Sequence, residues 1–383
     1  MTRMNSVHPT ISRTSVPSRR TRRVSLALQG GGSHGAFTWG VLDALLEDGR
    51  LEFDRISGAS AGAVNAVALA QGYASAQADG GDAEAARAAA RASLERVWRR
   101  VAGIGSLGAV AQHFGRLLLG GASGERMRAT LGTPPMHWVS PYRSNPLDIN
   151  PLRSLLGEEI DFEALAALDA PRVFVSATHV RTGRAEVFSG EGLTLASVMA
   201  STCLPTLFQA VEIDGEHYWD GGYSANPALL PLVDRCENTD ILLVQLNPLA
   251  HDSTPYTPQD ITERISELAF NASLLSQMRS IDFLNRMLAD GRLQEGEQRR
   301  RLMLHRIGID SATEAMPSAS KLSTDGAMIE LLFERGRAAA RDWLKRHFEA
   351  LGKRSTIDIQ LDYVTGMAPA ALGVAGQKDR KRA

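Results

Sequence analysis

Two apolar runs near the start of the chain each lead through glycines into a helix-like segment. Residues 24–29 and 53–57 are short and strand-like, residues 36–47 repeat apolar side chains at helical spacing, and residues 63–70 are an apolar helix start. Each run with its following segment predicts a strand, a tight loop and a helix. Two such units in succession favour an α/β fold with a mostly parallel sheet and helices on both faces.

The rest of the chain continues this alternation and then becomes helical. Apolar runs separated by turn residues predict a hairpin over 173–178 and 185–188, and residues 241–246 predict another buried strand. Helical patterns are found at residues 74–100, 261–288 and 328–348. The first of these helices is rich in Ala, Arg and Glu and is predicted to be exposed. The last carries an apolar stripe, which can dock on the core or lie on a membrane surface.

Residues 101–124 contain many glycines and yet are apolar, with three consecutive leucines at 117–119. This composition is too apolar for a plain linker. The segment is either a packed helix or a mobile lid that contacts lipid, because long irregular insertions often serve a binding site. In the second case the three leucines are expected to lie on a lipid surface.

Composition and charge narrow the class of protein. The 42 Lys and Arg residues nearly cancel the 43 Asp and Glu residues, so no overall charge attracts nucleic acid, and no nucleic-acid partner is expected. Cys203 and Cys236 cannot form a disulfide framework or a zinc site of usual spacing. No apolar run reaches the roughly 18 residues of a membrane-spanning helix. A cytoplasmic protein is expected, with peripheral contact to a membrane or lipid surface left open.

The residues 30–35, Gly-Gly-Gly-Ser-His-Gly, lie between the first predicted strand and helix. Glycines there let the backbone turn tightly and leave successive N–H groups uncovered at a helix N-terminus, where they bind anions. The anion can be a nucleotide phosphate or the oxyanion that forms when an ester carbonyl is attacked. The loop also matches GxGxxG, with Asp54 near the spacing of a ribose-binding carboxylate, so a nucleotide-binding oxidoreductase is an alternative at this stage.

The residues 58–62, Gly-Ala-Ser-Ala-Gly, follow one strand later. Small residues around Ser60, including Gly58 and Gly62, permit a strained strand-to-helix turn that exposes the serine hydroxyl. A dinucleotide-binding fold has no use for such a turn at this place. The two motifs together therefore favour acyl transfer, with Ser60 as the nucleophile.

A serine hydroxyl needs a base to become a nucleophile. None of the nine histidines lies in a context typical of a catalytic loop. A conventional triad with His217 as the base is the alternative within the same reaction class. Asp220 is followed by Gly221 and Gly222, which let backbone approach a substrate closely. An isolated Asp-Gly-Gly is most often a plain turn, but the two upstream motifs favour Asp220 as the base.

Three motifs in this order, the glycine loop, residues 58–62 and Asp220 with its two glycines, resemble the signature of the patatin-like phospholipase family. Residues 200–205 and the Asn-Pro pair at 226–227 also resemble the family's sequence around its catalytic aspartate. The resemblance covers residues 24–248. It implies a three-layer α/β/α sandwich and hydrolysis of fatty-acyl esters of lipids, of the phospholipase A or lysophospholipase kind.

Carried over residue by residue, the resemblance implies that Ser60 and Asp220 form a catalytic dyad that works through an acyl-enzyme. It also implies a lipid ester as the partner and chemistry without a metal or other cofactor. The oxyanion hole is expected in the loop residues Gly30, Gly31, Gly32, Ser33 and Gly35. One departure is His34, which stands where many members have Arg or Lys, so no fixed positive charge is implied there.

The expected organisation has four parts. They are a basic and disordered tail at 1–23, a catalytic domain at 24–248, a helical extension packed on it at 249–352, and a partly disordered tail at 353–383. Because a fold does not guarantee activity, the alternative function is a lipid-surface or granule-associated protein with weak or no catalysis. The lipid head group and the oligomeric state stay open at this point.

Overall fold

A mixed sheet lies at the centre of the molecule. The computed structural model describes residues 21–118, 140–234, 238–250, 254–296, 300–309 and 325–365. The strands in this part of the chain are β1 (Arg22–Leu28), β2 (Leu51–Ala59), β3 (Arg172–His179), β4 (Ala185–Phe188), β5 (Val211–Ile213), β6 (Glu216–Asp220), β7 (Asp240–Gln245) and β8 (Met303–Gly308). Their order is β5-β6-β3-β2-β1-β7-β8, with β4 also paired to β3. Strands β3, β2, β1, β7 and β8 are parallel, whereas β4, β5 and β6 are antiparallel.

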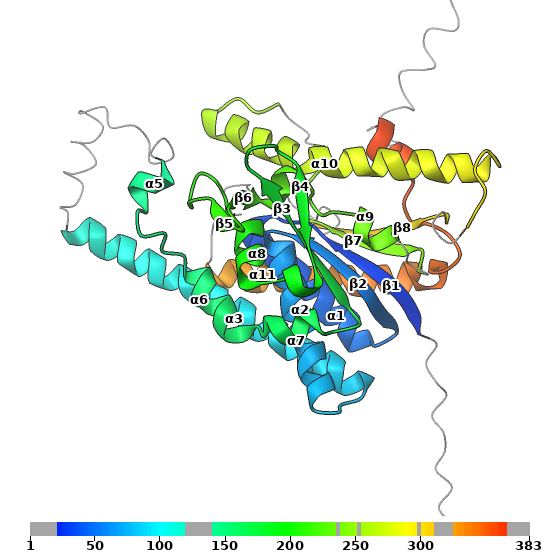
Figure 1. Ribbon diagram of the computed structural model, residues 1–383, viewed down its shortest axis with the longest axis horizontal. Coiled ribbons are helices and arrows are strands. Elements are labelled where there is room, and N and C mark those ends of the chain that lie inside the picture. The colour runs from blue at the N-terminus through cyan, green and yellow to red at the C-terminus, as the bar shows by residue number, and fades with distance from the viewer. Residues whose placement is uncertain are drawn as a thin grey trace, which may run out of the picture.

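Helices cover both faces of this sheet. They are α1 (Gly35–Asp48), α2 (Ala61–Ala78), α3 (Ala83–Leu118), α5 (Pro141–Ser144), α6 (Pro151–Glu159), α7 (Phe162–Ala166), α8 (Leu195–Ser201), α9 (Leu230–Val233), α10 (Pro258–Ala289) and α11 (Gly326–His347). Helices α1, α2, α3 and α11 share a core with one face, and α9 and α10 pack on the other. Figure 1 shows α10 on one side of the strands and α1, α2 and α3 on the opposite side. The predicted three-layer α/β/α fold is confirmed.

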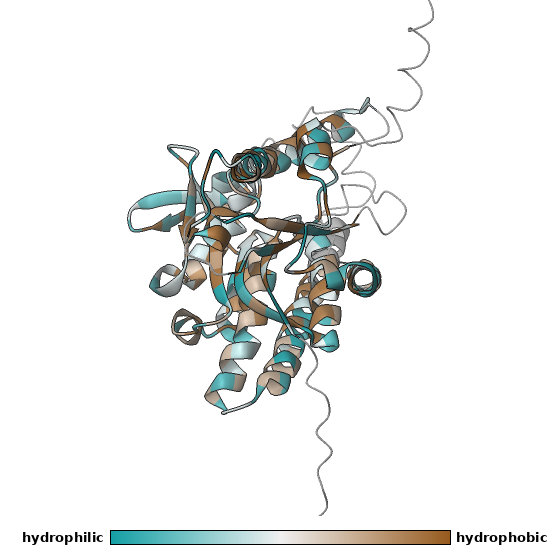
Figure 2. Cartoon of the chain, turned by 90° about the vertical axis from the view of Figure 1, so that its right-hand side faces the viewer, coloured by the Kyte–Doolittle hydropathy of each residue, from teal (hydrophilic) through white to brown (hydrophobic). Residues whose placement is uncertain are grey.

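The central strand β1 shows why the apolar runs are nearly continuous. Val24, Leu26 and Leu28 belong to the core shared with α1 and α2, whereas Ala27 belongs to the core shared with α10. A parallel strand that is covered on both faces buries successive side chains, so it has no polar face. Apolar colouring accordingly concentrates in the strands at the centre of Figure 2.

Both opening strand–loop–helix units are confirmed as β1–α1 and β2–α2, and the predicted hairpin is β3–β4. The exposed helix predicted for residues 74–100 is wrong in two respects. The chain breaks between α2 and α3, and the side chains of Ala90, Leu94, Val97 and Trp98 are buried. Small alanines allow close packing of α3 on α2, whereas the Arg and Glu residues of the same helix lower its mean hydropathy, which explains the misleading composition.

Helix α3 also covers most of the apolar segment at residues 101–124, which was expected to be either a packed helix or a lid. Because α3 continues to Leu118, residues 101–118 are helical. The side chains of residues 117–119, at which lipid contact was expected, lie outside the described residues. The terminal residues 1–20 and 366–383 also lie outside them. Strand β8 was not predicted and extends the central sheet. Among the helices that the structure describes, none has both the length and the apolar character needed to cross a bilayer.

Candidate active site

The two motif loops leave neighbouring strands at the same edge of the sheet. Strands β1 and β2 are parallel, with Leu28 opposite Gly58, so residues 29–35 and Ser60 both follow at the carboxyl edge. A Cβ atom placed on Gly30 would lie only 2.7 Å from Cβ of Ser60. The glycine loop and the serine turn are therefore in direct contact, and a side chain at position 30 would force them apart.

Ser60 has the strained backbone expected from its motif. Its φ is 53° and its ψ is −124°, a conformation that is costly for a residue with a side chain. Its N–H donates to Oγ of Ser201 at 2.9 Å, and its carbonyl accepts from the N–H of Ala63 at 2.9 Å as α2 begins. A Cβ atom on Gly62 would collide with the carbonyl oxygen of Leu28. These contacts hold the turn that presents Ser60.

Asp220 reaches Ser60 through the register of three strands. In β3, Ala177 pairs with Asp220 at the end of β6, and Ser176 pairs with Ala59, the residue before Ser60. The two residues are thus brought to the same edge of the sheet from distant parts of the sequence. The turn after Asp220 has no room for a side chain at its first glycine, because a Cβ atom there would collide with the carbonyl oxygen of Ser176.

The carboxyl of Asp220 is fully buried. Its Oδ1 accepts a hydrogen bond from the N–H of Gly222 at 2.7 Å, and its Oδ2 has no hydrogen-bond partner in the described structure. Burial raises the pKa of Asp220 to about 7, and the nearby hydroxyl of Ser60 and the N–H of Gly222 lower it less strongly. No regular hydrogen bond joins the two described side chains of Ser60 and Asp220, and such contacts are often loose in a free enzyme.

His217 and His305 lie away from these contacts. His217 is exposed, and because it is three residues before Asp220 on the same strand, its side chain points to the opposite face. His305 is buried, but its Nε2 is hydrogen-bonded to Asp240 at 2.9 Å at the other end of the sheet. The ring nitrogens of His179 and His305 are hydrogen-bonded to Glu216, Thr182, Asp240 and Thr356, and not to Ser60 or Asp220.

Cys203 is the described thiol nearest to this turn. Its carbonyl accepts the N–H of Asp220 at 2.8 Å, and its Sγ donates to the carbonyl of Gln209 at 3.0 Å. Burial, reinforced by the charge of Asp220, raises the pKa of the Cys203 thiol to about 12. This cysteine is therefore a structural residue, since the thiolate is the reactive form.

Hydrogen bonding divides the N–H groups of the glycine loop into two sets. The N–H of Gly30 donates to Oδ1 of Asn226 at 2.7 Å, and that of Gly35 donates to carbonyls within the loop. The N–H groups of Gly31 and Gly32 have no acceptor among the described residues. These two groups lie just before α1, where an anion finds the positive end of the helix dipole.

Polar side chains that the sequence analysis did not single out hold this loop. Gln29 is fully buried, accepts from the N–H groups of Leu246 and Asn247 at 2.8 Å each, and donates to Asn271 at 3.1 Å. Asn247 donates to the carbonyl of Gly30 at 2.9 Å. The sequence signal for these residues is that Gln29 directly follows the buried strand β1 and Asn247 comes two residues after the buried strand β7, at the edge where Ser60 lies.

Helix α10 contacts the aspartate turn as well as the loop. Ser273 accepts the N–H of Asn226 at 3.1 Å. Phe270 packs edge-on against Tyr223, with 5.0 Å between ring centroids, and leaves no free space above Gly222. The candidate site is therefore completed by a helix from the C-terminal part of the chain.

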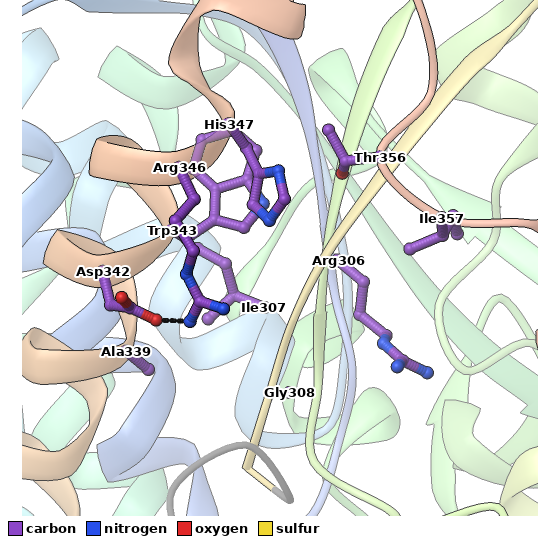
Figure 3. Close-up of a pocket in the computed structure, with 10 residues that line it drawn as sticks. All are labelled: Arg306, Ile307, Gly308, Ala339, Asp342, Trp343, Arg346, His347, Thr356 and Ile357. Atoms are coloured by element: carbon purple, nitrogen blue, oxygen red, sulfur yellow. Dashed lines mark ion pairs between the residues drawn. The ribbon is translucent and has the colours of Figure 1, made fainter. Parts of the chain in front are cut away.

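A pocket of about 320 Å³ lies elsewhere, between α11 and the edge strand β8. Figure 3 shows side chains such as Arg306, Trp343 and His347 around it, and neither Ser60 nor Asp220 lines it. We place the candidate site at Ser60 because strain, burial and uncovered N–H groups meet there. Among the described residues no cluster of three or more His, Cys, Asp or Glu side chains could hold a metal ion.

The chain matches the model of the family described as patatin-like phospholipase over residues 26–233, that is 208 of its 383 residues. No curated protein matches it. Similar solved structures include VipD from Legionella pneumophila, with 15% identity, coverage of 88% of this chain and 72% of that chain, and a TM-score of 0.36. Another is the ExoU–SpcU complex from the type III secretion system of Pseudomonas aeruginosa, with 18% identity and a TM-score of 0.36, where the match covers 86% of this chain and only 53% of that one. Since the family model spans more than half of its residues, this chain belongs to the patatin-like phospholipase family.

Proposed function

We propose that the chain is a lipid acyl hydrolase that cleaves fatty-acyl esters with Ser60 as nucleophile and Asp220 as general base. Membership of a phospholipase family supports a lipid hydrolase. The residue assignment rests on one observation, the buried carboxyl of Asp220 with an unpaired Oδ2 beside the strained Ser60. Its pKa, raised to about 7 by burial, makes this carboxylate a better base than one in water, because a base works best when its pKa is near the operating pH.

The reaction follows from these positions. Oγ of Ser60 attacks the ester carbonyl while Oδ2 of Asp220 accepts the hydroxyl proton. The new C–O bond gives a tetrahedral intermediate, and the N–H groups of Gly31 and Gly32 donate to its oxyanion. The intermediate collapses, the ester C–O bond breaks, Asp220 returns the proton to the leaving alcohol, and an acyl-enzyme remains. Water then attacks the acyl group with Asp220 as base, and the fatty acid is released.

Lipid substrate arrives from an aggregate, and exposed apolar side chains flank the site. Ile261, Ile265 and Leu268 are exposed on the first half of α10. This half of the helix is anchored beside the catalytic turn, because Phe270 packs on Tyr223. The three side chains supply a surface for the peripheral lipid contact that we include in the proposal, in a cytoplasmic setting.

A fluorophosphonate probe followed by peptide mass spectrometry tests the assignment. The wild type should be labelled on Ser60, and Ser60→Ala should be unlabelled and inactive on a short soluble ester. His217→Ala should be labelled at nearly the wild-type rate, because its side chain lies on the opposite face of β6. A folded wild type that binds vesicles but is neither labelled nor active would favour the lipid-surface protein instead.

A further inference from the structure

Asn226 lies against the glycine loop and is held on two sides. Its side chain is fully buried, and its Oδ1 accepts the N–H of Gly30 at 2.7 Å. Its own N–H donates to Ser273 at 3.1 Å, and the preceding carbonyl, that of Ala225, accepts from Ser176 at 2.8 Å. The amide therefore has a fixed place and one available orientation, since Gly30 requires an acceptor and only Oδ1 can serve.

This orientation leaves the donor half of the amide unused. Nδ2 of Asn226 is buried and has no hydrogen-bond partner in the described structure. A buried donor without an acceptor destabilises a fold, and near a reacting centre a ligand or reacting group can supply that acceptor.

Gly30 shows how close this amide is to the nucleophile. A Cβ atom placed on Gly30 would lie 3.1 Å from Oδ1 of Asn226 and 2.7 Å from Cβ of Ser60. The amide and the serine thus meet at the same glycine. Beside Ser60 there is also Oδ2 of Asp220, a buried acceptor that likewise has no partner in the described structure. The unpaired Oδ2 of Asp220 can accept the proton of the serine hydroxyl. The unpaired Nδ2 of Asn226 can donate to the oxyanion that forms when the serine attacks the ester.

We propose that Asn226 is a third donor of the oxyanion hole, whose Nδ2–H group donates to the carbonyl oxygen of the ester as it becomes an oxyanion. The inference rests on the proposed function. The proton lost by Ser60 passes to Asp220, the amide keeps both of its protons, and no other reactant is required. Oδ1 of the same amide holds Gly30, so one side chain both positions the loop and binds the reacting oxygen beside the N–H groups of Gly31 and Gly32.

The variant Asn226→Asp separates these two roles. A carboxylate of the same shape keeps an acceptor for Gly30 but removes the Nδ2 donor. The matched control is Asn247→Asp, which makes the same chemical change at the side chain that holds the carbonyl of Gly30. This control therefore adds a negative charge beside Gly30 and removes a hydrogen-bond donor from it, while the unpaired Nδ2 of Asn226 is left in place.

Two measurements compare the variants, kcat and KM for a soluble ester and Ki for a trifluoromethyl ketone that forms a tetrahedral adduct on the serine. Asn226→Asp should lower kcat by about 10²–10³-fold with little change in KM, and Ki should rise by a similar factor, because the donor acts on the transition state. In Asn247→Asp, Ki should rise less than in Asn226→Asp, even where thermal stability falls equally.

The inference fails if the wild type is labelled by the fluorophosphonate on Ser60 while Asn226→Asp binds the ketone as tightly as the wild type, or no worse than Asn247→Asp. Absence of labelling on Ser60 of the wild type would overturn the proposed function itself. If Asn226→Asp does not fold, Asn226→Ser replaces it as a neutral variant that also lacks the amide donor. The same selective loss of ketone affinity is then expected, and its absence overturns the inference.

Discussion

Asp240 and Asp220 are both buried in the sheet, one where β7 starts and one where β6 ends. Oδ1 of Asp240 is hydrogen-bonded to Nε2 of His305 and to the N–H of Gly352, at 2.9 Å each. Asp220 has one such contact, to Gly222, and its Oδ2 has none in the described structure. A buried carboxylate with several partners fixes the arrangement of chain segments. One that lacks partners stays available for a proton, at a cost in stability.

The largest difference between the two aspartates is expected from Asp220→Asn. The amide keeps the shape and the contact to Gly222 but cannot accept the serine proton, so kcat should fall by about 10²–10⁴-fold. The variant should also be more stable than the wild type at pH 8, by up to roughly 4 kcal/mol, because burial raises the pKa from 3.8 to about 7. Ester hydrolysis and urea unfolding at pH 8 measure both effects, and a variant that keeps a large share of the wild-type kcat would contradict the role of Asp220.

The dependence on pH should separate activity from stability. Because the proposed base Asp220 has to be ionised to accept a proton, kcat/KM should fall about tenfold per pH unit below its pKa of about 7. The pKa of this group is raised in the folded state, so its contribution to the free energy of unfolding is fully present below pH 3.8 and is lost as the pH rises through about 7. Activity and this part of the stability therefore change in opposite directions. Unfolding curves of wild type and Asp220→Asn at a series of pH values should converge toward pH 4, and parallel curves would contradict the assignment.

Asp240→Ala should have the opposite effects to Asp220→Asn, with lower stability and nearly unchanged activity. Removal of one partner of the buried Asp240–His305 pair should lower the free energy of unfolding by about 3 kcal/mol. Turnover per folded molecule should stay within about threefold of the wild type, as expected for distant sites that do not share contacts. Thermal unfolding and active-site titration with the fluorophosphonate give the two numbers. A large loss of kcat in fully folded protein would show that the two edges are coupled.

Ser201→Ala should cause the smallest change in stability of the three variants. The change leaves the buried N–H of Ser60 without its acceptor at 2.9 Å, which costs about 1–3 kcal/mol of stability. The strained turn also loses one of its restraints, so kcat should fall by less than about tenfold, in keeping with a lost contact outside the reacting atoms. Ser201→Thr, which keeps the hydroxyl, is the control. Equal behaviour of the two variants would mean that the hydrogen bond does not hold the turn.

The features that could be predicted from sequence are those for which the local backbone conformation restricts the residue type. Gly30 and Gly62 have no space for a side chain, so the presence of glycine at these positions indicates that the segments after β1 and β2 approach each other closely. The turn at Ser60 could be predicted for a similar reason, because its positive φ requires small residues on either side. Two strand–loop–helix units and the motif residues follow directly from such signals.

The features that could not be predicted depend on contacts between distant segments. Asp220 was expected in a turn, but nothing local indicates that it ends an antiparallel strand paired with β3. Strand β8 depends on its pairing with β7. The contact of Gln29 with Asn271 joins residues separated by most of the chain, and amide side chains are common enough that only the fold shows which of them meet. The packing of Gly72 against Ala90 likewise buries a helix whose composition is typical of an exposed one.

Helix α10 lies after the region matched by the family model, yet Asn271 and Ser273 hold the glycine loop and the segment after Asp220. During synthesis on the ribosome, the strands that carry Ser60 and Asp220 emerge well before this helix does. Ser60 and Asp220 are therefore present for some time in a nascent chain whose glycine loop still lacks its contacts with α10. For the hydrolase proposed above, activity is therefore expected only after α10 has left the ribosome and docked, late in folding.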